Sequence, residues 1–271
     1  MDDMSGAPSA HSFDDALRLA PDGARRWLAR ADKRYWNAIG PWGGWTAGLL
    51  LKAVLSEDDH AGAPVAMTVN LMAGLDESPI TLETRAVRQG RSMEFWTSEL
   101  IQNGEAAAMA MITLGQRRET FGAHEAVFPE APAPETIQRP TRKGGPPFGA
   151  MIETRAVSGT PFQPENESSR SLAWVRDAEG RRLDAPLLAA LADVFLPRTF
   201  YRMTEYRPIS TVSMSVYFHA TPADLVRIGG DFILAEAQAR RFESGFYDQQ
   251  GALWSRDGVL LATTEQLCWF K

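Results

Sequence analysis

Two hairpin dipeptides at corresponding places in the chain constrain the fold most strongly. Asn103-Gly104 and Asp257-Gly258 each lie between two strand-like runs, and Gly104 and Gly258 are 154 residues apart. Asn-Gly and Asp-Gly tolerate the positive φ angles of a tight β-hairpin. A helix-like segment and further strand-like runs precede each hairpin in the same order. The sequence therefore predicts a structural unit that occurs twice.

Each unit is predicted to contain one helix followed by four strands. The predicted helices are residues 43–56 and 186–196, and Pro197 ends the second one. The strands predicted after the first helix are residues 66–72, 80–88, 93–102 and 106–114. Those predicted after the second helix are residues 211–219, 232–240, 252–255 and 259–270. One more strand fits ahead of each helix, near residues 26–39 and 171–176.

The predicted helices are apolar on nearly every side, and Asp193 is the single polar residue among nine apolar ones in the second helix. A helix without a polar face is buried, here by the sheet of its own repeat. The pattern predicts an α+β fold of the double-hotdog class. In that fold each of two tandem repeats has a central helix wrapped by a curled antiparallel sheet.

A stretch rich in proline and glycine separates the two repeats. Proline fixes φ and removes a hydrogen-bond donor, so this stretch can neither continue a helix nor join the interior of a sheet. We expect an N-terminal hotdog repeat over residues 1–128, a linker over 129–149, and a C-terminal repeat over 150–271 that carries the candidate catalytic residues.

Charge and hydropathy exclude several classes of protein. The chain has 28 basic and 34 acidic residues, a formal charge of −6, and lacks the concentrated basic surface of a nucleic-acid-binding protein. No apolar run reaches the roughly 18 residues of a membrane span, and the first residues lack the pattern of a signal peptide. We expect a soluble, cytoplasmic protein that binds neither nucleic acid nor a membrane.

Motifs for covalent, metal or nucleotide chemistry are missing from the sequence. It has no glycine-rich phosphate motif and no nucleophile elbow, and its four histidines are scattered. The one cysteine, Cys268, lies on the last predicted strand, where a small buried hydrophobe is the favoured interpretation. We therefore expect no metal and no cofactor.

Asp193 is the strongest catalytic candidate. Its apolar surroundings disfavour the charged form, and a raised pKa suits a general base. An equally weighted interpretation is structural, with Asp193 capping backbone groups or pairing with Arg198 or Arg202. Thr211 and Gln266 are each ordinary for a strand or a solvent-facing position. Together with an aspartate, however, a hydroxyl and an amide can orient one water for hydrolysis without a covalent intermediate.

The motifs in both halves resemble those of bacterial acyl-CoA thioesterase II. The resemblance covers nearly the whole chain from about residue 26 and is carried by six segments: 43–44, 90–92, 101–104, 192–193, 210–219 and 257–266. In that family an Asp, a Thr and a Gln hold the attacking water, and the match assigns these roles to Asp193, Thr211 and Gln266. It also implies a fatty acyl-CoA substrate, no cofactor, and homo-oligomers of double-hotdog chains. At Ser213-Met214 the family often has Asp-His, a departure that bears on substrate preference.

The predicted activity is hydrolysis of fatty acyl-CoA to free acid and CoA. Gly43 and Gly44 at the start of the first helix are the candidates for contacting the substrate oxyanion through backbone N–H groups. Gly90 and Arg91 are the candidates for the CoA phosphates, against the alternative that the arginine is simply solvated. The other functions considered are a non-catalytic acyl-CoA or lipid-binding protein and an enoyl-CoA hydratase. The hydratase motif has a histidine five residues after its aspartate, where this chain has Arg198.

Overall fold

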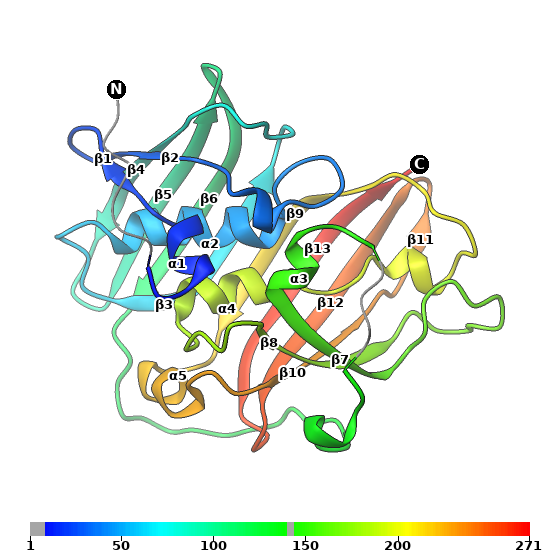
Figure 1. Ribbon diagram of the computed structural model, residues 1–271. Coiled ribbons are helices and arrows are strands. Elements are labelled where there is room, and N and C mark those ends of the chain that lie inside the picture. Colours follow the sequence, from blue (N-terminus) through cyan, green and yellow to red (C-terminus); the bar gives the residue numbers. More distant parts are fainter. Residues whose placement is uncertain (1–8, 140–143) are drawn as a thin grey trace.

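The computed structural model describes residues 9–139 and 144–271 of the chain. The helices are α1 (Ser12–Ala16), α2 (Gly43–Leu55), α3 (Phe148–Met151), α4 (Ala185–Leu191) and α5 (Pro222–Ile228). The helices labelled α2 and α4 lie side by side inside a strongly curved sheet (Figure 1). The strands of the first half are β1 (Ala20–Pro21), β2 (Arg26–Ala29), β3 (Ala63–Leu71), β4 (Ile80–Gln89), β5 (Met93–Gln102) and β6 (Glu105–Gly115). Those of the second half are β7 (Ile152–Ser158), β8 (Ser171–Asp177), β9 (Ile209–Phe218), β10 (Ile233–Gln238), β11 (Phe242–Glu243), β12 (Phe246–Ser255) and β13 (Leu260–Phe270).

The strand order is itself nearly symmetric about the middle of the sheet. It runs β1-β2-β4-β5-β6-β3-β9-β13-β12-β10-β8-β7, with the short β11 paired to β12. The two halves meet at the antiparallel pair β3–β9, where Thr68 lies opposite Ser215 and their hydroxyl oxygens are 3.0 Å apart. The predicted double-hotdog α+β fold is confirmed.

The two predicted hairpins differ in detail. Asn103 and Gly104 both have positive φ angles, as a two-residue turn between β5 and β6 requires. In the second hairpin only Gly258 has a positive φ, and the backbone N–H of Ser255 donates to the Val259 carbonyl at 2.8 Å. The turn is therefore longer than the two residues predicted, with glycine at the one left-handed position.

Helix α4 is shorter than predicted, because it ends at Leu191 and not at 196. The N–H groups of Asp193 and Val194 bond three residues back, to Ala190 at 3.0 Å and to Leu191 at 3.1 Å. These bonds tighten the chain into a turn, which places Asp193 two residues beyond the helix. Strand β7 and helices α1 and α5 were not predicted, and β12 begins six residues earlier than predicted.

The helices α2 and α4 pack antiparallel through glycines of α2. A Cβ atom built on Gly44 would lie 2.4 Å from the Ala190 carbonyl oxygen, and one on Gly48 would lie 3.0 Å from that of Pro186. Only a residue without a side chain permits so close an approach at Gly44. The start of α2 is therefore held against the end of α4.

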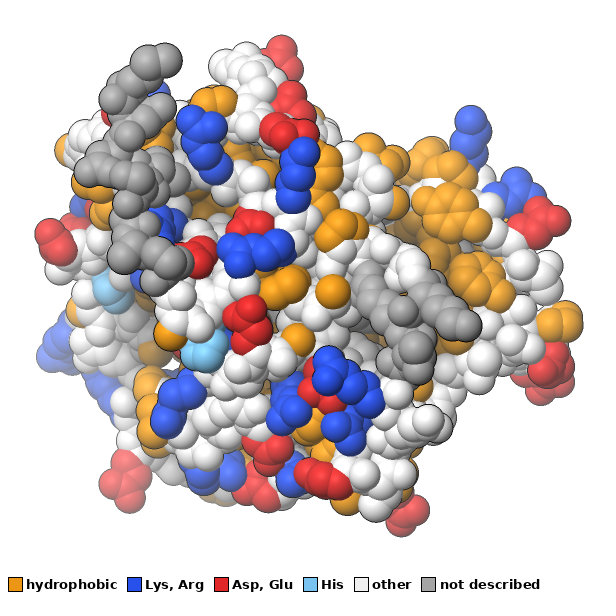
Figure 2. Space-filling view, viewed as in Figure 1, with side chains coloured by type: hydrophobic (Ala, Val, Ile, Leu, Met, Phe, Trp, Pro, Cys, Tyr) orange, Lys and Arg blue, Asp and Glu red, His pale blue; other side chains and the backbone are white. Residues whose placement is uncertain are grey.

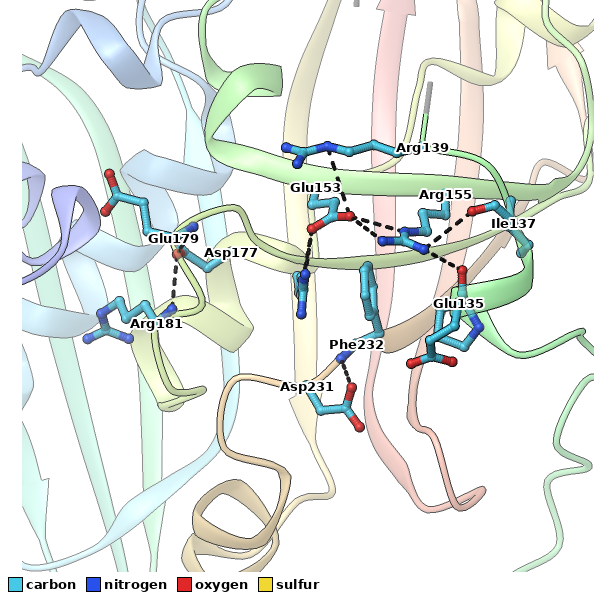
Figure 3. Close-up of polar contacts among 12 residues, drawn as sticks. Glu135, Ile137, Arg139, Glu153, Arg155, Asp177, Glu179, Arg181, Asp231 and Phe232 are labelled. Carbon is cyan, nitrogen blue, oxygen red and sulfur yellow. Dashed lines mark hydrogen bonds and ion pairs between the residues drawn. The ribbon is translucent and has the colours of Figure 1, made fainter. Parts of the chain in front are cut away.

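Most of the predicted linker, residues 129–149, packs on the second half, and its residues 140–143 lie outside the described part of the chain. The indole of Trp174 donates to the Pro132 carbonyl at 2.9 Å. Arg155 donates to the Pro134 carbonyl at 2.7 Å. It also pairs with the buried Glu153, as Figure 3 shows. The boundaries at 128 and 149 stay a prediction.

Charged side chains of both signs are interspersed on the face shown in Figure 2, in keeping with the small net charge. Among the described residues, no helix combines the length and the apolar character that crossing a bilayer requires.

Candidate active site

Three secondary-structure elements carry the predicted catalytic residues. Asp193 lies in the turn after α4, Thr211 near the start of β9, and Gln266 on β13. Strands β9 and β13 are hydrogen-bonded neighbours, with Gln266 opposite Met214 and Cys268 opposite Thr211. A register irregularity between Leu267 and Cys268 interrupts this ladder. Gln266 is 2% exposed, so its amide lies in the interior.

A continuous hydrogen-bond chain joins these three side chains. The Thr211 hydroxyl donates to Oε1 of Gln266 at 3.2 Å, and Nε2 of Gln266 donates to Oδ1 of Asp193 at 2.9 Å. An ionised carboxylate can only accept hydrogen bonds, so the amide nitrogen must face Asp193 and the amide oxygen must face Thr211. The structure thus brings together all three residues that the sequence selected.

The start of helix α2 completes the site. Oδ2 of Asp193 lies 2.8 Å from the point where a Cβ atom on Gly43 would stand, so a side chain at this position would displace the carboxylate. The backbone N–H of Gly44 stabilises the Asp193 carboxylate. The partial positive charge of a helix N-terminus acts in the same direction. Gly43 and Gly44 therefore lie at the site, with the Gly44 amide directed to the aspartate.

Trp42 is a site residue that sequence reasoning did not select. Its indole Nε1 donates to the backbone carbonyl of Asp193 at 2.9 Å, and its ring stacks on Phe148 at 4.8 Å between centroids. Trp42 thereby fixes the turn that carries the catalytic candidate. The signal in the sequence was its position directly before Gly43-Gly44, but aromatic core packing is the more common role of a tryptophan beside an apolar helix.

Burial dominates the electrostatics of Asp193. Desolvation raises the pKa of its carboxyl to about 7, and the hydrogen bonds from Gln266 and Gly44 offset only part of that effect. No arginine pairs with Asp193 among the described residues. Arg198, one of the two predicted partners, is fully buried and donates instead to Gln249 at 3.1 Å and Ser171 at 2.7 Å.

Cys268 is close to this site but is poorly suited to act as a nucleophile. The residue is 2% exposed, and burial raises the pKa of its thiol to about 11. A thiol with such a pKa is protonated at neutral pH and hence weakly nucleophilic. The interpretation of Cys268 as a small buried residue is confirmed.

The turn that carries Gly90 and Arg91 is not brought to this site. It joins β4 to β5, and the neighbouring Gln89 donates from Nε2 to the Asp59 carbonyl at 2.8 Å. Asp59 follows the C-terminal end of α2, and that helix is about 20 Å long. Asp193 faces the opposite end of the same helix. In the described part of the chain, Gly90 and Arg91 therefore make no contact with Asp193, Thr211 or Gln266.

Comparisons with known proteins match both halves of the chain. Residues 33–115 match the family model described as acyl-CoA thioesterase N-terminal domain, and residues 128–270 match the one described as acyl-CoA thioesterase C-terminal domain. Among curated proteins, none matches this chain.

Solved structures resemble the whole molecule. A conserved protein of unknown function with a hot dog fold from Alicyclobacillus acidocaldarius is 38% identical, with a TM-score of 0.93 over 97% of this chain and 99% of that chain. A putative thioesterase II from Thermobifida fusca is 18% identical, with a TM-score of 0.83 over 98% and 100% of the two chains. A tesB protein from Mycobacterium avium subsp. paratuberculosis is 20% identical, with a TM-score of 0.78 over 96% and 98%. Because the two matched family models follow one another along nearly all of a double-hotdog chain, the protein belongs to the acyl-CoA thioesterase family.

Proposed function

We propose that the protein hydrolyses fatty acyl-CoA thioesters to a free acid and coenzyme A, with Asp193 as the general base. One observation carries this proposal: a carboxyl with a pKa of about 7 is hydrogen-bonded to Gln266 beside the start of α2. A general base works best when its pKa lies near the working pH. Family membership supports the substrate class.

In the proposed reaction, Asp193 takes a proton from a water molecule as the water oxygen bonds to the thioester carbonyl carbon. Negative charge then develops on the carbonyl oxygen. The carbon–sulfur bond breaks, and the CoA thiolate leaves and recovers the proton from Asp193. No covalent enzyme intermediate is required, in agreement with the protonated thiol of Cys268.

Gln266 and Thr211 would position the base and the water. The amide of Gln266 holds Oδ1 of Asp193, and Oδ2, which lies beside Gly43, would take the proton. The Thr211 hydroxyl donates its one proton to Gln266. Towards any other group, such as the water, it can therefore act only as a hydrogen-bond acceptor. Hydrogen bonds from the water to Asp193 and to Thr211 would hold it in one orientation, which accelerates its attack on the thioester.

The developing oxyanion needs hydrogen-bond donors that are fixed before the reaction. The first N–H groups of a helix have no partner within the helix. The Gly44 amide already supports Asp193, so the Gly43 amide is the better candidate for the oxyanion. The absence of a side chain at Gly43 lets the substrate carbonyl approach the backbone.

The test compares two aspartates at opposite ends of the helix pair. Asp193→Asn keeps the shape of the proposed base and removes its ability to take a proton. Asp184→Asn makes the same chemical change at the start of α4, where asparagine still caps the helix. Hydrolysis of a medium-chain acyl-CoA is followed by the appearance of free CoA thiol.

We expect kcat/KM to fall at least about 100-fold in Asp193→Asn, within the usual range for loss of a general base. Asp184→Asn should stay within about twofold of the wild type, since Asp184 lies at the other end of the helix pair. Equal activity of Asp193→Asn and the wild type would refute the mechanism. Binding of acyl-CoA by the wild type without thiol release would instead identify a non-catalytic binding protein.

A further inference from the structure

The N-terminal segment is held against the turn that follows β8. The backbone N–H and the hydroxyl of Ser12 both donate to Glu179, at 2.7 and 2.6 Å. Phe13 is fully buried, and Asp14 pairs with Arg181 at 2.6 Å. The guanidinium of Arg181 also lies over the Phe13 ring, 5.3 Å from its centroid, so three consecutive residues of the α1 segment contact a turn more than 160 residues away in the sequence.

Three metal-ligand side chains converge where these segments meet. A ring nitrogen of His11 and one carboxylate oxygen each from Asp177 and Glu179 lie within 4.8 Å of one another. Asp177 is 2% exposed, and its Oδ1 accepts from the backbone N–H groups of Glu179 at 2.9 Å and Arg181 at 3.1 Å. Figure 3 shows Asp177 and Glu179 on this turn with the contact to Arg181.

Two polar atoms of this cluster are buried and have no hydrogen-bond partner in the described part of the chain, whereas both oxygens of Glu179 accept from Ser12. These two atoms are Oδ2 of Asp177 and Nδ1 of His11. Such atoms are rare in folded proteins, because an unpaired buried polar group forfeits its hydration. With Oδ1 fixed by two backbone donors, Oδ2 is the oxygen of Asp177 that is left to bind a ligand.

The hydroxyl of Tyr35 is a third such atom. Tyr35 is fully buried, and its oxygen has no hydrogen-bond partner in the described part of the chain. Its ring packs edge-on against that of Phe13, with 5.5 Å between centroids, so Tyr35 lies beside the α1 segment.

The local charge favours a cation. Among the described residues, no lysine or arginine lies within ion-pair distance of Asp177 or Glu179. The two arginines nearby are already paired, Arg34 with Asp32 at 2.6 Å and Arg181 with Asp14 and Asp184, both at 2.6 Å. Two carboxylates and one imidazole are thus left with a net negative charge.

We propose that His11, Asp177 and Glu179 bind one divalent transition-metal ion of the zinc type. Imidazole together with carboxylate suits Zn²⁺ and its neighbours in the first transition row, whereas Mg²⁺ and Ca²⁺ prefer oxygen ligands alone. Bond lengths of about 2.0–2.2 Å to zinc bring ligand atoms to about 3.3 Å from one another. The ligand atoms, which lie within 4.8 Å of one another, must therefore approach more closely, and the partly exposed His11, which precedes the short helix α1, can supply the movement.

Such an ion would fasten the α1 segment to the β8 turn. This site lies between the α1 segment and the turn after β8, away from Asp193 at the start of α2. The proposed metal binding therefore does not depend on the proposed hydrolysis. We expect metal to stabilise the folded state because it binds atoms that are brought together only there.

The experiment measures Zn²⁺ binding by untagged, chelator-treated protein in isothermal titration calorimetry. The variants are His11→Gln and Asp177→Asn, and the matched control is His124→Gln, which removes an exposed imidazole from another loop. The wild type and His124→Gln should each bind one Zn²⁺ per chain and show a higher melting temperature that EDTA reverses. Mg²⁺ should change neither quantity.

Loss of a ligand should weaken Zn²⁺ binding at least about tenfold, because even loss of an outer hydrogen-bond partner costs that much. His11→Gln decides the outcome if Asp177→Asn fails to fold, since Nδ1 of His11 makes no hydrogen bond that folding would lose. The proposal is overturned if the wild type binds no Zn²⁺ or if His11→Gln binds it as tightly as the wild type.

Discussion

The two central helices begin at opposite ends of their packed pair, and the two ends differ in chemistry. Helix α2 begins with Gly43 and Gly44, and the residue before them makes no side-chain cap. Helix α4 begins after Asp184, whose carboxylate accepts the Leu187 N–H at 2.9 Å, and has Pro186 in its first turn. One helix start is open towards a carboxylate, and the other is closed by its own cap.

The strands show the same asymmetry. With the 154-residue offset between the hairpin glycines, Gln266 on β13 corresponds to Ile112 on β6. Ile112 is fully buried and apolar, so it can neither orient a base nor hold a water. Duplication of the fold therefore did not duplicate the proposed active site, and we expect one site per chain.

The closed end has a hollow of its own. A pocket of about 300 Å³ lies between the end of α2 and the start of α4, with Lys52, Ser56, Asp184 and Pro186 in its lining. Arg181 pairs with Asp184 at 2.6 Å and neutralises the cap. No carboxylate comparable to Asp193, facing unpaired helix N–H groups, is found there among the described residues. A pocket without such a carboxylate does not make this end a second candidate site.

After the loss of Asp193 itself, the largest effect on activity is expected from exchanging the strand residues that distinguish the two ends. Gln266→Leu removes the donor to Asp193 and leaves the Thr211 hydroxyl without its acceptor. We expect kcat/KM to fall about 10- to 100-fold in steady-state assays, since the base and the water lose their orientation. The counterpart Ile112→Gln should keep its activity and lose about 1–3 kcal/mol of stability through an unsatisfied buried amide. Equal losses of activity in the two variants would show that the ends are not distinct.

The next largest effect concerns the glycine contact between the helices. Alanine at Gly44 would place a methyl group 2.4 Å from the Ala190 carbonyl oxygen, and alanine at Gly48 would place one 3.0 Å from that of Pro186. We expect Gly44→Ala to lower the free energy of unfolding by about 2–3 kcal/mol, and Gly48→Ala by less than about 1 kcal/mol. Urea denaturation measures both. Gly74→Ala, which meets no neighbouring atom, serves as the control, and a Gly44→Ala variant as stable as this control would contradict the packing argument.

The smallest effect is on stability at the open end. The pKa of Asp193 is raised to about 7 in the folded state, so between about pH 4 and 7 the folded chain holds a proton that the unfolded chain has lost. The stabilising effect of that proton is present at low pH and is lost as the pH rises through 7. Asp193→Asn should therefore match the wild type near pH 4 and exceed it by about 1–2 kcal/mol at pH 8. Urea denaturation at both pH values checks this, and a difference independent of pH would count against a buried carboxylate.

Much of the fold was predictable because it depends on local pattern. The hairpin dipeptides fixed the pairing of β5 with β6 and of β12 with β13, and the apolar helices required burial. The end of α4 was not predictable, since residues 192–196 continue an apolar run. Their departure from the helix depends on tertiary contacts of the turn, such as the bond from Trp42 to the Asp193 carbonyl.

The site was predictable in its residue types and only partly in its geometry. The apolar run singled out Asp193, resemblance to a family assigned roles to Asp193, Thr211 and Gln266, and the structure joins the three by hydrogen bonds. Gly90 and Arg91 carry no signal of position, because a turn between two strands can lie at either end of a sheet. Trp42 reaches the site through a contact across 151 residues, which no local pattern encodes.

The dependence of kcat/KM on pH tests the role of Asp193 most directly. The base is active only when deprotonated, so for one acyl-CoA substrate kcat/KM should rise about tenfold per pH unit from pH 5 and level off above about 7. The residual activity of Asp193→Asn should lack this rise. A wild-type profile that is flat from pH 5 to 9, or that falls as the pH increases through 7, would contradict the account.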